Sequence, residues 1–180
     1  MKELEELKER MATQRPESWD QLPDLALYMD QLISYMPRQL IRFEDGDALT
    51  SAMVNNYIKD GLLPRAEGKR YGKEHLAWLT AICALKSVIS MREMATLFEA
   101  RDPDQGPQEL YGIFLKELDR ALGRTAQRLE AGAEEETLAT LALRLALDSY
   151  ASKLACQRVL SILEEKEENT PQPGESKKKK

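Results

Sequence analysis

The chain has 180 residues and carries 26 lysines and arginines against 31 aspartates and glutamates, for a net charge of −5. A hydrophobic content of 42% and a charged content of 32% are typical of a soluble globular protein, and no apolar run approaches the roughly 20 residues of a membrane span. The acidic total argues against nucleic-acid binding by the whole surface, so such a site would need a local basic patch.

The N-terminal residues MKELEELKERM are charged and lack the apolar core of a signal peptide. We expect residues 1–21 to form a charged helical segment. Cys83 and Cys156 lie far apart in apolar helical patterns, which favours reduced core thiols in a cytoplasmic protein. With these two scattered cysteines and a single histidine, we expect no metal site and no cofactor.

Pro23 stands where a helix would begin, ahead of LALYMDQLISYM. Apolar residues repeat at helical spacing in this segment, which predicts one buried face. These residues are Leu25, Met29, Leu32, Ile33 and Met36. After Pro37 the chain reaches the turn residues Asp45, Gly46 and Asp47, which fall short of the oxygen ligands that a calcium loop requires.

Thr50 is a suitable N-cap for the next helix, and Gly61 fits the left-handed residue that ends many helices. Val54, Tyr57 and Ile58 lie at helical spacing and are predicted to face inward.

The outward face of this helix is polar. It carries Ser51, Asn55 and Lys59 at four-residue steps, with Ala52 and Asn56 beside them. Asparagine has a poor helix propensity, so two adjacent asparagines on a short helix indicate a binding role for their amides. The alternative is a tolerated solvent-exposed surface.

Past Gly61, Leu62 and Leu63 are predicted to enter the core, and Pro64 fixes an extended turn. AEGKRYG then predicts a tight loop with its charges at the tip. Between Lys59 and Lys73 the sequence carries five cations and only two acidic residues, Asp60 and Glu67. The cations are Lys59, Arg65, Lys69, Arg70 and Lys73.

A helix is predicted from about Lys73 to Val88, with His75 near its start as a surface or capping residue. Its inner set is Leu76, Leu79, Ile82, Cys83 and Leu85. Ser90 and Glu93 have the spacing of a capping box for the helix MREMATLFEA.

The order Thr50, NNYIKDGLLP, GKRY and LTAICALKSVISMREMATLF resembles the winged helix-turn-helix of MerR-type regulators. More closely, the chain resembles an uncharacterised bacterial family of MerR-like proteins known only as a domain of unknown function, over roughly Leu22 to Ala100. The resemblance implies an all-α fold with a small wing, in which residues 22–101 form a MerR-like helix-turn-helix domain.

The same resemblance implies DNA contacts. Tyr57 matches the tyrosine near the end of the recognition helix, which touches the DNA backbone. Arg70 and Tyr71 match the wing pair, of which the arginine reaches phosphate or the minor groove. The chain departs from the MerR pattern at Asn55 and Asn56, where those regulators usually have arginine and an aromatic residue.

Residues 102–168 are predicted to form a C-terminal helical region. Its first helix has one apolar face, made by Leu110, Ile113, Phe114, Leu118 and Leu122. The second helix, from Glu134 to about Glu165, has a wide apolar arc, which predicts burial on more than one side, either within the chain or against a second copy. This arrangement resembles that of MerR-type proteins, which dimerise through C-terminal helices, so we expect a homodimer.

Residues 169–180 form a Lys-rich tail with no large apolar residue and are predicted to be disordered.

These patterns favour a transcriptional regulator that binds double-stranded DNA. Ser51, Asn55, Asn56 and Lys59 would enter the major groove, where the asparagine amide can bond adenine N6 and N7. Lys69, Arg70 and Tyr71 would contact the backbone or the minor groove. The alternative is a protein–protein interaction module that kept the winged-helix scaffold and lost DNA binding. We do not expect an enzyme, because the chain lacks a nucleophile–histidine–acid set, a phosphate-binding glycine loop and a ligand cluster.

Overall fold

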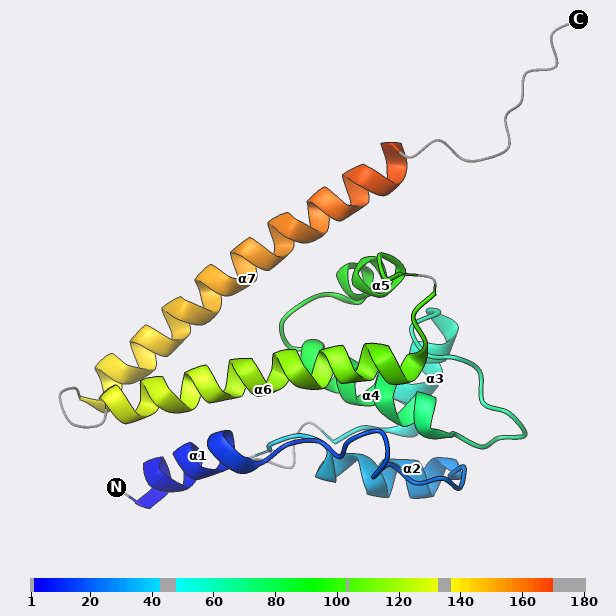
Figure 1. The fold of residues 1–180 in the computed structure, drawn as a ribbon, viewed down its shortest axis with the longest axis horizontal. Helices are drawn as coiled ribbons and strands as arrows, with labels where there is room; N and C mark the ends of the chain where they lie inside the picture. The colour runs from blue at the N-terminus through cyan, green and yellow to red at the C-terminus, as the bar shows by residue number, and fades with distance from the viewer. Residues whose placement is uncertain (1, 43–47, 103, 133–136, 170–180) are drawn as a thin grey trace, which may run out of the picture.

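A computed structural model of the chain describes residues 2–42, 48–102, 104–132 and 137–169. These residues form seven α-helices and one short 3₁₀ helix and contain no strand, which confirms the all-α prediction (Figure 1). The predicted Asp45–Gly46–Asp47 turn and the tail from residue 170 onward lie outside the described residues. Within them, no helix is long and apolar enough to cross a membrane.

Helix α1 (Lys2–Thr13) packs along helix α6 (Pro107–Gly132) and contributes no fully buried residue. An ion pair continues this contact beyond the helix end, with Arg15 Nε 2.6 Å from Asp119 Oδ1. A charged N-terminal helix is present, but it ends at Thr13, and residues 14–21 of the predicted helical segment are not helical.

Helix α2 (Met29–Tyr35) is shorter than the sequence predicts and continues into the 3₁₀ helix η1 (Met36–Arg38). The expectation of a helix starting at Pro23 is wrong. Leu27 instead forms an antiparallel bridge in which its N–H and C=O both bond Tyr71, at 2.9 Å each. An extended residue at this point stops the helix from beginning earlier, and Leu25, predicted to be buried, is 82% exposed.

Helix α3 (Ser51–Lys59) has the predicted ends. Thr50 caps it by accepting a hydrogen bond from the Met53 N–H at 3.2 Å. Gly61 follows with φ +75°, the left-handed conformation that glycine adopts without strain. The Leu62 and Leu63 N–H groups both return to the Tyr57 carbonyl, and both leucines are buried as predicted.

Helix α4 (Lys73–Leu85) is the centre of the fold. Its predicted inner set is confirmed: Leu76, Leu79 and Ile82 are completely buried, and Cys83 is buried beside them. The helix ends at Leu85 rather than near Val88, because a turn with a hydrogen bond from the Val88 N–H to the Leu85 carbonyl follows.

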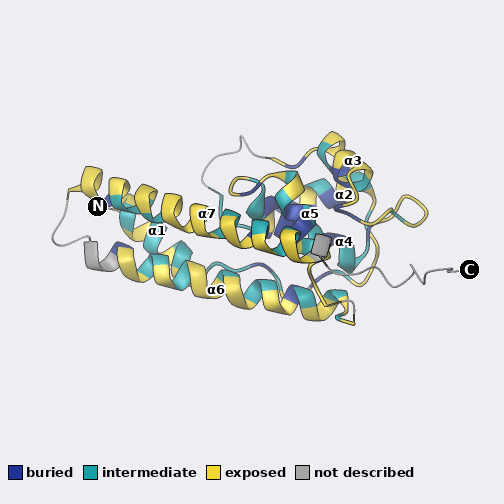
Figure 2. Ribbon diagram, turned by 90° about the horizontal axis from the view of Figure 1, so that it is seen from above, coloured by how far each residue is buried: buried dark blue, intermediate teal, exposed yellow. Residues whose placement is uncertain are grey.

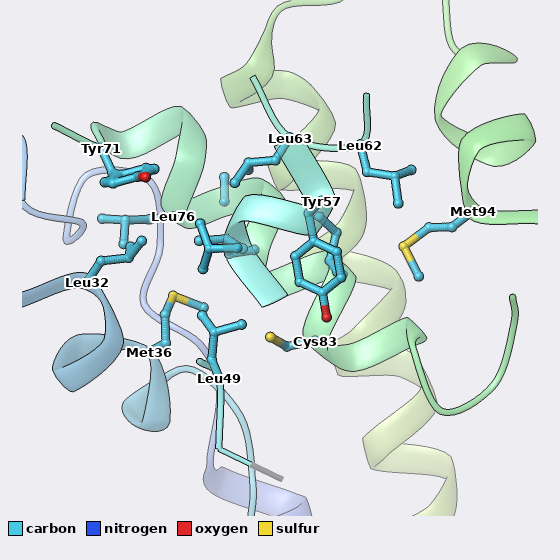
Figure 3. Packing of buried hydrophobic residues seen from close by; sticks show 14 of the residues in the cluster. Leu32, Met36, Leu49, Tyr57, Leu62, Leu63, Tyr71, Leu76, Cys83 and Met94 are labelled. Carbon is cyan, nitrogen blue, oxygen red and sulfur yellow. The ribbon is translucent and has the colours of Figure 1, made fainter. Parts of the chain in front are cut away.

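The core joins residues that lie far apart in the sequence (Figure 3). Leu32 and Met36 from the α2–η1 segment, Tyr57 from α3 and Leu76 from α4 all belong to one buried cluster. Met94 adds a contribution from helix α5 (Met91–Glu99). The orientation of α3 is thus set by its buried face.

Helix α7 (Leu138–Asn169) diverges from α6 and returns over α5 (Figure 1). Only Leu141 and Leu160 of its described side chains are fully buried, and its other side is exposed (Figure 2). On α6, Tyr111 and Leu129 are buried, whereas Ile113, predicted to lie on the buried face, is 46% exposed.

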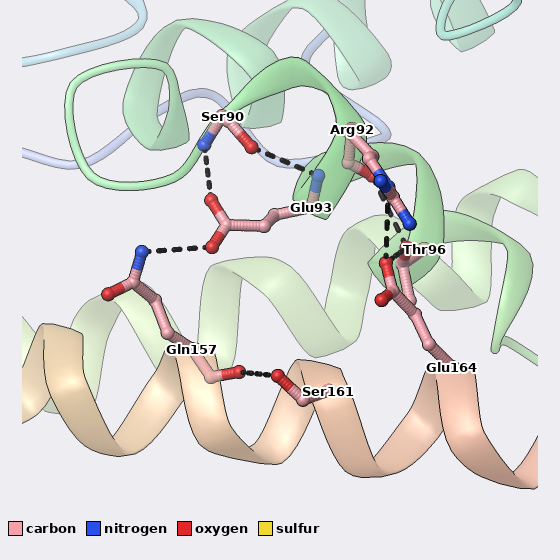
Figure 4. Close-up of polar contacts among 7 residues, drawn as sticks. All are labelled: Ser90, Arg92, Glu93, Thr96, Gln157, Ser161 and Glu164. Carbon is pink, nitrogen blue, oxygen red and sulfur yellow. Dashed lines mark hydrogen bonds and ion pairs between the residues drawn. The ribbon is translucent and has the colours of Figure 1, made fainter.

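A polar network attaches α7 to the start of α5 (Figure 4). Ser90 and Glu93 form the predicted capping box, with distances of 2.7 and 3.2 Å. The second Glu93 oxygen accepts a hydrogen bond from Gln157 Nε2 at 2.9 Å. Glu164 accepts another from the Thr96 hydroxyl at 3.0 Å. These contacts fix the rotation of α7 against α5.

Candidate nucleic-acid interface

The outward side of α3 carries the residues that the sequence singles out. Ser51, Asn55, Asn56 and Lys59 are all exposed, and the structure records no side-chain hydrogen bond or ion pair for them within the described residues. We call this set the α3 face. Val54 on the opposite side is completely buried, so the α3 face projects from an anchored helix.

Tyr57 does not belong to the α3 face. Its side chain is only 6% exposed, and Figure 3 shows its hydroxyl directed toward Cys83. Burial, followed by the nearby Cys83, raises the pKa of this phenol. The ring is a packing residue that orients α3, so we remove Tyr57 from the candidate contact surface.

The segment between α3 and α4 ends in a tight turn at Glu67–Arg70. Two backbone hydrogen bonds close it, from Glu67 N–H to Arg70 C=O at 3.2 Å and from Arg70 N–H to Glu67 C=O at 3.0 Å. Gly68 and Lys69 both have positive φ, 57° and 63°. This is the arrangement of a two-residue hairpin turn, and it leaves Lys69 exposed at the tip, as the predicted loop required.

Tyr71, predicted as a DNA contact, is 5% exposed. Its backbone forms the bridge to Leu27, and its ring meets His75 edge-on with centroids 5.4 Å apart. Burial raises the pKa of the Tyr71 phenol. The residue holds the base of the turn in place, so it is removed from the contact surface as well.

His75 is buried, which corrects the prediction of a surface position and keeps that of a capping role. Its Nδ1 accepts a hydrogen bond from the Gly72 N–H at 3.2 Å, and its Nε2 lies 3.3 Å from the Arg65 carbonyl oxygen. A neutral ring with the proton on Nε2 satisfies both contacts. The imidazole therefore links the two ends of the segment from Arg65 to Gly72.

Arg70 is positioned by a residue that the sequence did not indicate. Its Nη2 donates to the Tyr28 hydroxyl at 2.9 Å, and its guanidinium lies 4.9 Å from the centroid of the Tyr28 ring. Because 42 residues separate the two, no local pattern could have predicted the pair. Tyr28 is 47% exposed, so the stacked guanidinium stays accessible.

The basic patch is smaller than its composition suggests. Lys73 is 20% exposed and lies 2.7 Å from Asp24 Oδ1, so it is paired with a carboxylate. Arg65, Lys69 and Arg70 are exposed on the segment after α3, and Lys59 is exposed on α3 itself. The turn projects at the same end of the molecule as α3 (Figures 1 and 2). The structure thus brings the α3 face and these cations to one region.

In the described part of the chain, no three histidine, cysteine or acidic side chains are placed together to hold a metal ion.

Residues 17–114 match the family model described as a domain of unknown function (DUF1836). The match begins before α2 and ends within α6, so it contains both the α3 face and the turn. No match was found among curated proteins or among solved structures. Because more than half of the sequence matches this model, the chain belongs to the DUF1836 family.

Proposed function

We propose that this protein binds double-stranded DNA through the α3 face and the Glu67–Arg70 turn, and that it acts as a transcriptional regulator. The observation that carries the proposal is the α3 face: four exposed polar side chains on a helix whose other side is fixed in the core. An α-helix fits the major groove, and side chains projecting from an anchored helix can reach base edges.

The chemistry of the two parts differs. Asn55 and Asn56 can each donate and accept in one plane, which suits adenine N7 and N6. Lys69 and Arg70 are suited to phosphate, because a cation contributes affinity without sequence information. The Tyr28 contact holds the guanidinium beside the turn, which lowers the entropy lost when Arg70 binds a phosphate.

We infer a MerR-like use of these elements, with α3 as the recognition helix and the turn as the wing. One feature differs from a compact helix-turn-helix. Residues 39–50 separate η1 from α3, whereas the helices of that motif are joined by a turn of about three to four residues.

A second copy is part of the proposal, because α3 is short and the patch holds few cations. The exposed side of α7 presents an apolar row in which Leu143, Leu147, Tyr150 and Leu154 are 60%, 57%, 66% and 56% exposed. We call it the α7 stripe. Its steps of four, three and four residues form a continuous helical seam, and exposed apolar surface of this kind typically marks an interface.

Charge favours an antiparallel pair of α7 helices. In the heptad that the α7 stripe defines, a parallel pair would place Lys153 against Arg158 of the second copy, and like charges at these positions repel. An antiparallel pair places Lys153 beside Ala146 and brings Leu143 opposite Leu154.

Two single-cysteine chains, Leu143→Cys and Leu154→Cys, test this arrangement in a background with Cys156→Ala. An antiparallel dimer predicts disulfide cross-links between the two variants when they are mixed and oxidised. Cross-links within each variant alone would indicate a parallel pair. A chain that stays at 20.5 kDa in light scattering at tens of micromolar would contradict the dimer.

The alternative function is a protein–protein interaction module. The α7 stripe favours it, because the stripe is an exposed apolar surface that a partner protein could cover. The pairing of Lys73 with Asp24 also favours it, because this pair leaves fewer unpaired cations in the basic patch.

Selection from a library of random duplexes separates the two functions. The purified full-length chain should enrich a defined sequence, and the affinity for that sequence should fall as the salt concentration rises. If no sequence is enriched and duplexes are retained no better than by an unrelated acidic protein, DNA binding is wrong and the interaction module is left.

A further inference from the structure

An apolar cleft lies between α4, α5 and α6, on a part of the surface that the proposed DNA contacts do not use. Its volume is about 400 Å³, within the roughly 300–1,000 Å³ of pockets that hold small molecules. Carbon atoms form nearly all of its walls. The main contributors are Trp78, Leu85, Leu97, Phe98, Tyr111 and Phe114.

Aromatic rings give the cleft a shape suited to a flat molecule. The Trp78 and Phe98 rings pack with centroids 4.7 Å apart. Tyr111 and Phe114 stack at 6.1 Å with 17° between their planes. Trp78, Phe98 and Phe114 are only partly buried and line the cleft, and a ring-containing ligand packs favourably against aromatic side chains.

Two charged residues line the cleft, Arg101 and Glu117. Arg101 lines it with its guanidinium 5.0 Å from the Trp78 ring centroid, and among the described residues this is the one interaction recorded for the guanidinium. Glu117, the other charged lining residue, is already paired with Arg120 at 2.6 Å. An arginine without a carboxylate partner beside an apolar cavity complements a single anionic group.

We propose that this cleft binds a small organic anion with a flat apolar body and one carboxylate or sulfonate group. The body stacks among Trp78, Phe98 and Phe114, and the anionic group bonds the Arg101 guanidinium at the mouth. This binding does not depend on the proposed DNA contacts, so it can be tested without DNA.

The probe is 1-anilinonaphthalene-8-sulfonate, which has this shape and charge, titrated into the full-length chain. Its emission should rise to saturation at one molecule per chain. Absence of saturable binding would overturn the proposal.

Four variants at three exposed positions locate the probe without threatening the fold. Arg101→Gln should weaken binding about tenfold, as expected for a lost charged hydrogen bond, and Arg101→Lys should restore part of it. Ile113→Glu places an anion at the mouth and should weaken binding at least as much. Val159→Glu, at a 57% exposed apolar position of α7 outside the α7 stripe, is the matched control and should change the affinity by less than about twofold.

The neutral analogue N-phenyl-1-naphthylamine tests the charge itself. It should bind the parent chain more weakly than the sulfonate and bind Arg101→Gln as well as it binds the parent. Equal affinity of the two probes for the parent would overturn the anionic assignment. Loss of binding in Leu147→Glu, with Ile113→Glu unchanged, would place the probe on the α7 stripe and overturn the cleft as its site.

Discussion

Helices α3 and α7 both place one side against the core and leave the other side exposed, but the two exposed sides differ in chemistry. α3 exposes a hydroxyl, two amides and an ammonium group, whereas α7 exposes three leucines and a tyrosine along one row. The polar α3 face is stable in water without a partner. Exposure of the α7 stripe to water is unfavourable, and burying its apolar area would lower the free energy.

The two helices are also held differently. The ends of α3 are fixed by the Thr50 cap and by Gly61, and Val54 and Tyr57 anchor its inner side. Thr137 caps the start of α7 by accepting a hydrogen bond from the Thr140 N–H at 3.3 Å, but the rest of this longer helix depends on its contacts with α5. In the proposed function, α3 would serve as a preformed recognition element and α7 would be completed by association.

The largest expected effect contrasts the same substitution in the two regions. Leu79→Ala, at a completely buried position, should lower the free energy of unfolding by about 2–5 kcal/mol, from lost burial and the cavity. Leu147→Ala, at a position 57% exposed, should change it by less than about 0.5 kcal/mol in dilute solution. Urea denaturation at low protein concentration measures both. Similar losses for the two would mean that α7 is buried even in the monomer.

A second experiment tests the polar face of α3. Asn55→Ala and Asn56→Ala should each weaken binding to the best selected duplex by roughly 1–3 kcal/mol, with little effect on random DNA. Lys69→Ala should weaken binding evenly and reduce the salt slope by about one unit.

Competition binding at several salt concentrations separates the two patterns. Gln108→Ala, an exposed polar position on α6, is the control. If the asparagine variants bind all duplexes as the parent does, α3 is a scaffold rather than a reader.

Much of the helical pattern could be predicted because its signals are local. The Thr50 cap, the Gly61 stop and the Ser90–Glu93 capping box each involve atoms within a few residues. The start of α2 could not be predicted. The Leu27–Tyr71 bridge that prevents helix there joins residues far apart in the sequence, and local propensity at Pro23 favoured the opposite outcome.

The candidate site shows the same division. Helical spacing identified the α3 face, since side chains four residues apart share a side. It could not show that Tyr71 turns inward against His75, that Lys73 is paired with Asp24, or that Tyr28 supports Arg70. Each of these depends on how the α2 region packs against the turn.

Tyr28 provides a test of that packing with a smaller effect. Tyr28→Ala removes both the hydroxyl partner and the ring beneath Arg70. It should weaken DNA binding by about 0.5–1 kcal/mol, the range for an exposed cation–π contact, without changing sequence preference. Tyr28→Phe keeps the ring and should retain most of the affinity. Equal losses for the two variants would assign the effect to the hydroxyl alone.

The smallest expected effect concerns the joint between α5 and α7. Hydrogen bonds from the Ser90 backbone and hydroxyl, and then from Gln157, hold the pKa of Glu93 below its ordinary value of 4.5. A carboxylate whose pKa is depressed on folding stabilises the folded state above its unfolded pKa, and this contribution is lost as the pH falls through the folded pKa.

Glu93→Gln keeps an acceptor for the cap but cannot titrate. The parent should therefore be more stable than Glu93→Gln near neutral pH, and the difference should shrink between about pH 5 and pH 3. Chemical denaturation across this range measures it, with Glu99→Gln, exposed on the same helix, as the matched removal of a carboxylate. With Gln157→Ala present in both chains, the pH-dependent difference in the free energy of unfolding should become smaller. This substitution removes the α7 side chain that donates to the second Glu93 oxygen. A difference that stays constant with pH would show that the Glu93 charge does not fasten α7 to α5.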